Sequence, residues 1–151
     1  MHALRSMIAV AALAVYGPAH AEVGGPEVLI YRLSGVAESG GAMGVTTAFH
    51  CTNFSGITET VRVVVRSNGG ALAANAALPV PHLNTAILST HNVSIYLNTL
   101  LLTDIFQGTA AIAATSVNVT CTAMQVQTNV TNPVGIALHM TRFNPVPGSQ
   151  E

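Results

Sequence analysis

The chain has 151 residues, of which 50% are hydrophobic and 7% are charged, and its formal net charge is −1. A chain so rich in apolar residues and so poor in charge is unlike a disordered protein. Its five arginines, with no lysine and against six acidic residues, exclude the basic surface that nucleic-acid binding requires, and the length suits one domain.

The N-terminus has the features of a secretory signal peptide. Arg5 supplies positive charge, an apolar run extends from Met7 to Tyr16, and Ala19-His20-Ala21 is an A-x-A cleavage site. The run is shorter than the roughly 20 apolar residues of a transmembrane helix. We therefore expect cleavage of residues 1–21, a single mature domain over residues 22–151 without a membrane span, and a periplasmic or secreted location. The use of Arg to the exclusion of Lys, with many Ala and Gly residues, indicates a bacterial gene.

The mature chain is rich in Val and Thr, which favour half-buried pleated surfaces. Between Glu59 and Ser67, three valines alternate with Arg62, Val64 and Arg66, which predicts a strand with one face in solvent. Ser67-Asn68-Gly69-Gly70 then predicts a hairpin turn, and Pro79-Val80-Pro81 predicts an edge or a crossover. The strands that we expect are Glu27–Leu33, Val45–Thr52, Glu59–Ser67, Ala71–Leu78, Thr85–Thr90, Thr109–Thr115, Asn118–Gln127 and Val134–Phe143.

Seven to eight short strands at this spacing predict an all-β fold, an antiparallel β-sandwich of immunoglobulin-like type. The segment from Asn92 to Phe106 departs from the pattern. Leu97, Leu101 and Ile105 are spaced by four, which favours one or two helical turns over a crossover between the sheets.

Cys51 and Cys121 are the only two cysteines. Each lies in an alternating apolar stretch and is expected to face inward, and an oxidising compartment favours a disulfide between them. We expect this bond to cross the sandwich core and to stabilise the fold by about 4 kcal/mol. A metal or redox pair of thiols is the alternative, but no C-x-x-C motif is present.

Four histidines remain after cleavage: His50, His82, His91 and His139. None of them is spaced i, i+2 or i, i+4 from another, and none has an acidic neighbour in the sequence. We interpret them as surface or locally hydrogen-bonded side chains, with His50 pointing away from Cys51 towards water. The alternative is that two or three of them converge on a metal.

The sequence contains no catalytic motif such as a G-x-S-x-G elbow or a distinctive pair of opposed carboxylates. We therefore expect no enzymatic activity and no cofactor. A pocket that holds Asp104 or Glu59 beside a histidine would reverse this interpretation.

Arg62 and Arg66 share one face of their strand and are candidates for binding a carboxylate or an anionic sugar, because guanidinium groups present paired donors. The alternative is a solvated face that pairs with Glu59 or with a neighbouring strand. The absence of Trp disfavours a carbohydrate site built on aromatic platforms.

Four motifs together resemble a group of small exported bacterial proteins that are described as hypothetical. The resemblance extends over most of the mature chain. It implies export and paired cysteines, and it implies no activity or ligand. The motifs are His50-Cys51-Thr52-Asn53, the segment QGTAAIAATS that begins at Gln107, Cys121-Thr122-Ala123-Met124, and the closing stretch from Arg142-Phe143-Asn144-Pro145 to Glu151.

We therefore expect an exported, non-catalytic β-sandwich with a structural or interaction role at the cell envelope. Its partner would be another protein or a second copy of itself, because large exposed apolar patches mark interaction sites. The alternative function is a periplasmic protein that binds a metal or a small ligand through its histidines. We expect no nucleic-acid partner.

Overall fold

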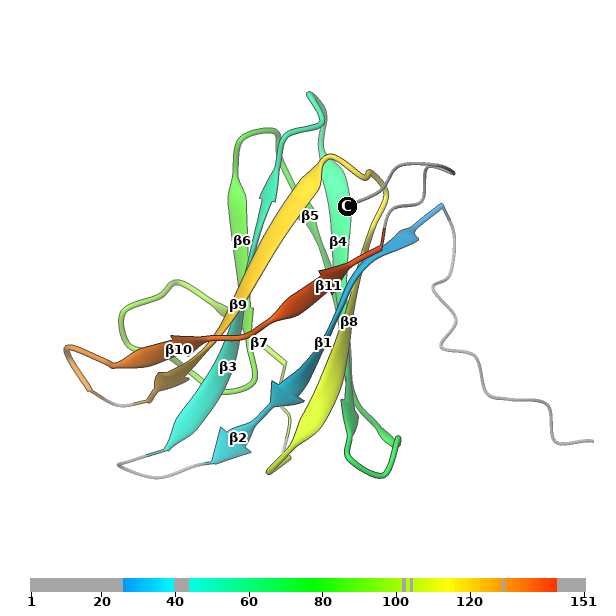
Figure 1. The fold of residues 1–151 in the computed structure, drawn as a ribbon. Coiled ribbons are helices and arrows are strands. Elements are labelled where there is room, and N and C mark those ends of the chain that lie inside the picture. Colours follow the sequence, from blue (N-terminus) through cyan, green and yellow to red (C-terminus); the bar gives the residue numbers. More distant parts are fainter. Residues whose placement is uncertain (1–25, 40–43, 102, 104, 129, 144–151) are drawn as a thin grey trace, which may run out of the picture.

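The computed structural model describes residues 26–39, 44–101, 103, 105–128 and 130–143. Within these ranges the chain forms eleven strands and no helix, and the strands build two sheets packed face to face (Figure 1). The predicted β-sandwich is confirmed, whereas its immunoglobulin-like type stays a prediction. The predicted signal peptide lies outside the described residues.

Sheet A has the order β11-β1-β8-β4-β5, and all its neighbouring strands are antiparallel. The predicted hairpin joins β4 to β5, where Gly70 adopts a φ of 83° that favours glycine. Pro79 lies in β5 at the edge of the sheet, which is where a residue without an N–H is tolerated. The strands of sheet A are β1 (Val28–Val36), β4 (Glu59–Ser67), β5 (Leu72–Val80), β8 (Gly108–Ala114) and β11 (Met140–Arg142).

Sheet B has the order β10-β9-β3-β6-β7, and β2 also pairs with β3. Its pairs are antiparallel except for β6 and β7, which are parallel. The strands of sheet B are β2 (Glu38–Ser39), β3 (Val45–Asn53), β6 (Thr85–Ser89), β7 (Thr99–Leu100), β9 (Val119–Gln127) and β10 (Gly135–Ala137).

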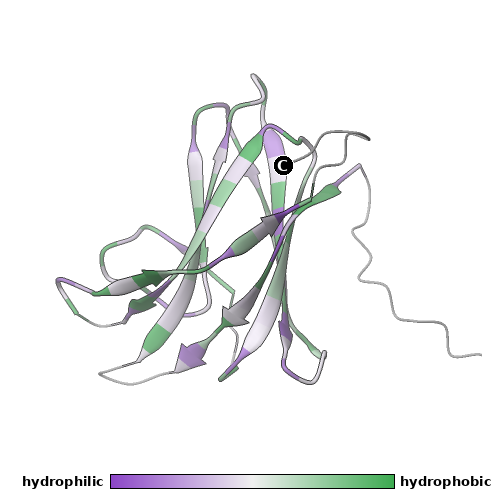
Figure 2. Cartoon of the chain, in the orientation of Figure 1, coloured by the Kyte–Doolittle hydropathy of each residue, from purple (hydrophilic) through white to green (hydrophobic). Residues whose placement is uncertain are grey.

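The main core fills the space between the sheets with the inward side chains of both. Phe49 and Leu88 from sheet B and Ile112 from sheet A are fully buried there. Apolar and polar residues alternate along the central strands, as Figure 2 shows in its alternating bands. This alternation explains why the positions of most strands follow from the sequence.

A second, smaller core covers the outer face of sheet B. Ala48 and Val126 from the sheet are buried beneath Val93, with Tyr96 and Met124 packed against them. Val93 and Tyr96 belong to the loop between β6 and β7, residues 90–98. This loop, the flap, lies over the outer face of sheet B.

The helical turns predicted between Asn92 and Phe106 are wrong, because the described residues of this segment form a loop and β7. Their apolar side chains point to different places: Val93 packs on the outer face of sheet B, Leu101 and Ile105 enter the main core, and Leu97 is 99% exposed. One face of a helix cannot pack against both sides of a sheet, so the spacing of four residues between Leu97, Leu101 and Ile105 does not indicate a helix here.

The final strand predicted over Val134–Phe143 is divided between the two sheets. Its first part, β10, pairs with β9 in sheet B, and its second part, β11, pairs with β1 in sheet A. The chain therefore crosses from one sheet to the other at Leu138 and His139 and completes an edge of each. In the described part of the chain no helix is long and apolar enough to span a membrane.

Candidate functional site

The structure joins Cys51 and Cys121 in the predicted disulfide. The two residues face each other in register on the adjacent strands β3 and β9, with their Cα atoms 4.1 Å apart. The bond therefore lies within sheet B, and the expectation that it crosses the sandwich is wrong. Both side chains point into the main core, as their alternating neighbours predicted.

His50 lies on the outer face of β3, opposite in direction to Cys51, but it does not simply face water. Its ring packs edge-on against Tyr96 of the flap, with 4.8 Å between the ring centroids. Its Nε2 atom is buried without a hydrogen-bond partner among the described residues. Burial lowers the pKa of His50 below its ordinary value, because the charged form loses hydration.

His82 and His139 lie in two different connections of the chain. His82 follows β5, and its Nδ1 accepts a hydrogen bond of 3.0 Å from the backbone N–H of Gly56. His139 is exposed between β10 and β11. In the described part of the chain, no three His, Cys, Asp or Glu side chains are placed so that they could hold a metal ion.

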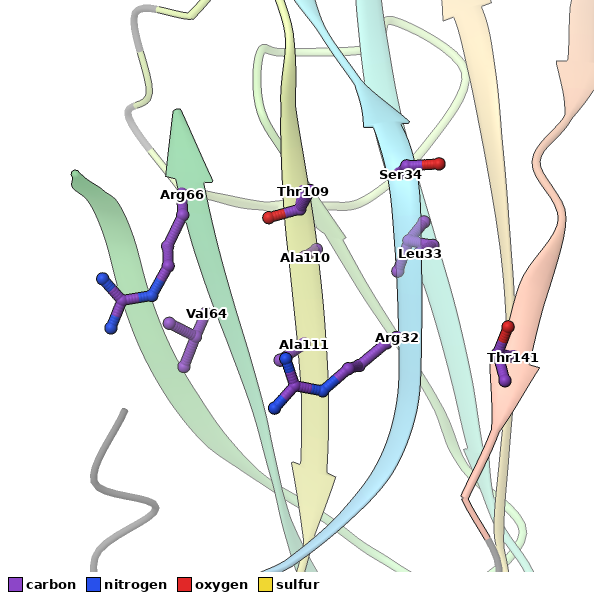
Figure 3. Close-up of a pocket in the computed structure, with 9 residues that line it drawn as sticks. All are labelled: Arg32, Leu33, Ser34, Val64, Arg66, Thr109, Ala110, Ala111 and Thr141. Carbon is purple, nitrogen blue, oxygen red and sulfur yellow. The ribbon is translucent and has the colours of Figure 1, made fainter. Parts of the chain in front are cut away.

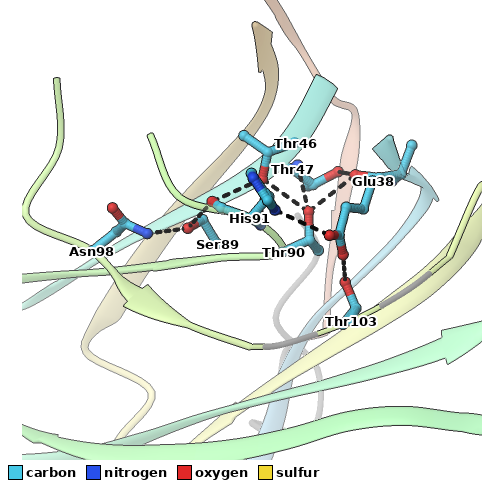
Figure 4. A network of polar contacts seen from close by, with 9 residues as sticks. Glu38, Thr46, Thr47, Ser89, Thr90, His91, Asn98 and Thr103 are labelled. Atoms are coloured by element: carbon cyan, nitrogen blue, oxygen red, sulfur yellow. Dashed lines mark hydrogen bonds and ion pairs between the residues drawn. The ribbon is translucent and has the colours of Figure 1, made fainter. Parts of the chain in front are cut away.

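Among the four candidate histidines, His91 is the one that the described part of the structure brings beside a carboxylate. Its Nδ1 lies 3.2 Å from Oε1 of Glu38, while Oε2 of Glu38 accepts a hydrogen bond of 2.6 Å from the hydroxyl of Thr103 (Figure 4). The three side chains line a pocket of about 290 Å³ together with Thr90, Asn92 and Leu100. The sequence did not reveal this cluster, because Glu38, His91 and Thr103 are far apart along the chain.

Threonine hydroxyls continue this network into sheet B. The hydroxyl of Thr90 bonds to that of Thr46 at 2.9 Å and accepts the backbone N–H of Thr47 at 2.9 Å. Thr46 in turn accepts the backbone N–H of His91 at 2.8 Å. These bonds continue the pairing with β3 beyond the end of β6, where the N–H of Thr90 also donates to the backbone oxygen of Thr47 at 3.0 Å. They fix the start of the flap (Figure 4).

The order of the groups in this cluster determines what chemistry it supports. In a nucleophilic triad the imidazole lies between the hydroxyl and the carboxylate, so that it can remove the hydroxyl proton. Here the carboxylate of Glu38 lies between Thr103 and His91, and the hydroxyl donates to it directly. The geometry therefore favours a structural clamp that ties β2 to the segment after β6.

Glu59 is one of the two acidic residues that would indicate an enzyme if they lay in a pocket beside a histidine. Glu59 is buried at the start of β4, where the hydroxyl of Thr115 donates to its Oε2 atom. The same hydroxyl oxygen accepts the backbone N–H of Thr60, so Glu59 is part of the junction between β4 and β8. Asp104 lies outside the described residues.

The two predicted arginines, Arg62 and Arg66, differ in whether a carboxylate neutralises them. Arg62 forms an ion pair with Glu27, with Nε 2.6 Å from Oε2, and also donates to Asn75. The hydrogen bond to Glu27 raises the pKa of Arg62 above its ordinary value. Arg66 instead donates to the backbone oxygen of Gly70 at 2.9 Å and forms no ion pair within the described part of the chain.

Arg66 lines a hollow of about 290 Å³ on the outer face of sheet A, together with Arg32 from β1. Figure 3 shows both side chains on this face, with Ala111 of β8 and Val64 of β4 between them. Val64 was predicted to face solvent, but it is buried although it lies on the outer face. The sequence pattern does not indicate Arg32 as a site residue, because Arg32 is isolated between the two inward residues Tyr31 and Leu33.

Comparison with protein-family models, curated proteins and solved structures gives no match for this chain.

Proposed function

We propose that the protein is an exported, non-catalytic β-sandwich that acts as an interaction module at the cell envelope and self-associates through the β10 edge of sheet B. Export is supported by the charged start, the apolar run and the A-x-A site of residues 1–21. The disulfide between Cys51 and Cys121 also suits an oxidising compartment. The resemblance to small exported bacterial proteins agrees with this location.

The observation that carries the proposal is the apolar, open edge of sheet B. β10 is the last strand in the order of this sheet, with β9 on one side, so no described strand pairs with the backbone N–H and C=O groups of its other edge. Its side chains are apolar as well, and Ile136 is 68% exposed. The preceding Val134 is equally exposed, and it lines a shallow pocket with Ile136 and Val45.

The flap adds further apolar surface next to this edge. The hydroxyl of Ser94 donates to the backbone oxygen of Val130, which ties the flap to the connection between β9 and β10. The neighbouring Ile95 and Leu97 are exposed, and Leu97 has 99% of its surface free. Figure 2 shows apolar colour on β10 and on parts of the flap. Surfaces of this kind mark sites of association.

A second copy of the chain is the occupant that the charges favour. Residues 92–101 and 130–139 contain no Asp, Glu, Lys or Arg, so two such edges meet without repulsion between like charges. A charged side chain is one of the devices by which natural proteins prevent the pairing of edge strands, and the three residues of β10 carry no charge. An antiparallel β10–β10 pair related by a two-fold axis satisfies the open backbone groups of both copies.

A pair of matched variants tests the proposal by size-exclusion chromatography with light scattering. Ile136→Lys places a charge at the edge of β10, whereas Ile57→Lys places the same charge at a side chain of almost identical exposure, 67%, in the loop before β4. We expect a dimer for the wild type and for I57K, and at least about tenfold weaker association for I136K. A monomeric wild type, or equal association of the two variants, would refute self-association through β10.

A further inference from the structure

We propose that the hollow on the outer face of sheet A binds a small dicarboxylate between Arg32 and Arg66. This site lies on the face opposite the flap and does not depend on the proposed self-association. Its lining comes from β1, β4, β8 and β11 of one sheet.

The register of sheet A explains why a hollow forms at this place. Arg32 on β1 lies opposite Ala111 on β8, which lies opposite Val64 on β4. In the next outward row, Thr109 of β8 lies between Ser34 and Arg66. The central strand β8 thus carries small side chains, and each of the strands beside it contributes an arginine. The small side chains leave a hollow in the middle of the face, and the two guanidinium groups border it (Figure 3).

The two arginines are unneutralised within the described part of the chain. Arg32 lies over the ring of Phe143 at 5.8 Å, and Arg66 donates one bond to a backbone oxygen. A guanidinium has five N–H donors, so most donors of both groups remain open.

The glutamates of the described residues are all engaged elsewhere. Glu27 pairs with Arg62, Glu38 bonds with His91 and Thr103, and Glu59 accepts the hydroxyl of Thr115. The hollow therefore holds two positive charges that the described fold itself does not balance, although the chain as a whole has a net charge of −1.

The dimensions of the hollow indicate the class of ligand. Neighbouring strands are about 4.8 Å apart, so the backbones of β1 and β4 are about 10 Å apart across β8. Figure 3 shows Arg32 leaning across β8 and Arg66 leaning away from it, towards the hairpin between β4 and β5. The two separated guanidinium groups suit a molecule with one carboxylate at each end of a short carbon chain. Val64 and Ala111 offer methyl groups to that carbon chain, and the hydroxyl of Thr109 offers a further donor at the rim.

Calorimetric titration of the oxidised protein with succinate tests this assignment, with acetate and inorganic phosphate as comparison ligands. We expect succinate to bind more tightly than either of the other two, since acetate engages one arginine and phosphate is too short to reach both. Arg32→Gln and Arg66→Gln should each weaken succinate binding about tenfold, because each removes a charge-assisted pair of hydrogen bonds.

Arg62→Gln is the matched control, because it removes the same charge from the same face but outside the hollow. We expect it to change succinate affinity less than about twofold, and we expect Ile136→Lys to retain succinate binding. If R62Q and R32Q lost succinate affinity equally, general electrostatic attraction would explain the binding, and the proposed site would be overturned. Tighter binding of phosphate or acetate than of succinate, or no succinate binding at millimolar concentration, would overturn the dicarboxylate.

Discussion

His50 shows at the residue scale how the flap changes the chemistry of a surface position. His50 precedes Cys51 on β3 and points to the outer face of the sheet, which would leave the imidazole in water. However, Tyr96 packs against the ring, and Nε2 is buried without a hydrogen-bond partner among the described residues. Burial lowers its pKa, so the unfolded chain takes up a proton near pH 6.5 before the folded chain does. The contribution of His50 to stability is therefore complete above pH 6.5 and is lost as the pH falls through the lowered pKa.

Replacement of His50 by Phe tests this coupling. His50→Phe keeps an aromatic ring against Tyr96 and removes both the buried nitrogen and its protonation. We expect the free energy of unfolding of the variant, measured by urea denaturation, to fall less between pH 8 and pH 5 than that of the wild type. His82→Gln, which retains an acceptor for the N–H of Gly56, is the control. An equal loss of stability in wild type and H50F would contradict the account.

At the scale of elements, the disulfide links two strands that already pair along their whole length. β3 and β9 are in register from Val45 opposite Gln127 to Asn53 opposite Val119, with the cysteines directly opposite each other. The bond closes a loop with a sequence separation of 70 residues, which includes β4 and β8 of the other sheet. It therefore restricts the unfolded chain across both sheets although it is local in the fold.

The loss of stability on removal of the disulfide can be predicted. Cys51→Ala with Cys121→Ala should lower the free energy of unfolding by about 4 kcal/mol in the chain-entropy account, with an added cost for the volume lost from the core. The reduced wild-type protein keeps both side chains and separates these two effects. Unchanged denaturation midpoints on reduction would show that the bond does not constrain the unfolded chain.

The elements also show how far the sequence predicts the fold. The bounds of β4 agree with prediction, because its valines are buried between a turn and a polar start. The stretch from Val134 to Phe143 alternates equally well, yet it divides between two sheets. Alternation reports which side chains are apolar, and it carries no information about the partner of an edge strand.

The candidate sites were harder to predict for the same reason. Arg66 was identified because Arg62 precedes it on the same strand, whereas its actual neighbour Arg32 comes from β1, two strands away. Glu38 and His91 likewise meet only through the pairing of β2 and β6 with β3. Such juxtapositions depend on the order of strands in the sheet, which local spacing does not determine.

At the scale of the whole molecule, charge and apolar surface are sorted to different faces. Arg32 and Arg66 are on the outer face of sheet A, while the flap and β10 border the outer face of sheet B without a formal charge. This sorting supports a molecule with an apolar edge that contacts a second copy and a cationic face that stays open to small anions.

Hydrogen exchange measured by mass spectrometry at two protein concentrations tests the central claim, that β10 pairs with β10 of a second copy, most directly. Backbone N–H groups at an open strand edge exchange rapidly, and pairing protects them. We predict that the peptide covering residues 130–139 becomes more protected as the concentration of the oxidised protein rises, while peptides from β5, the edge strand of sheet A, do not change. Protection of residues 130–139 that is the same at both concentrations, in a sample that contains dimers at the higher one, would contradict the account.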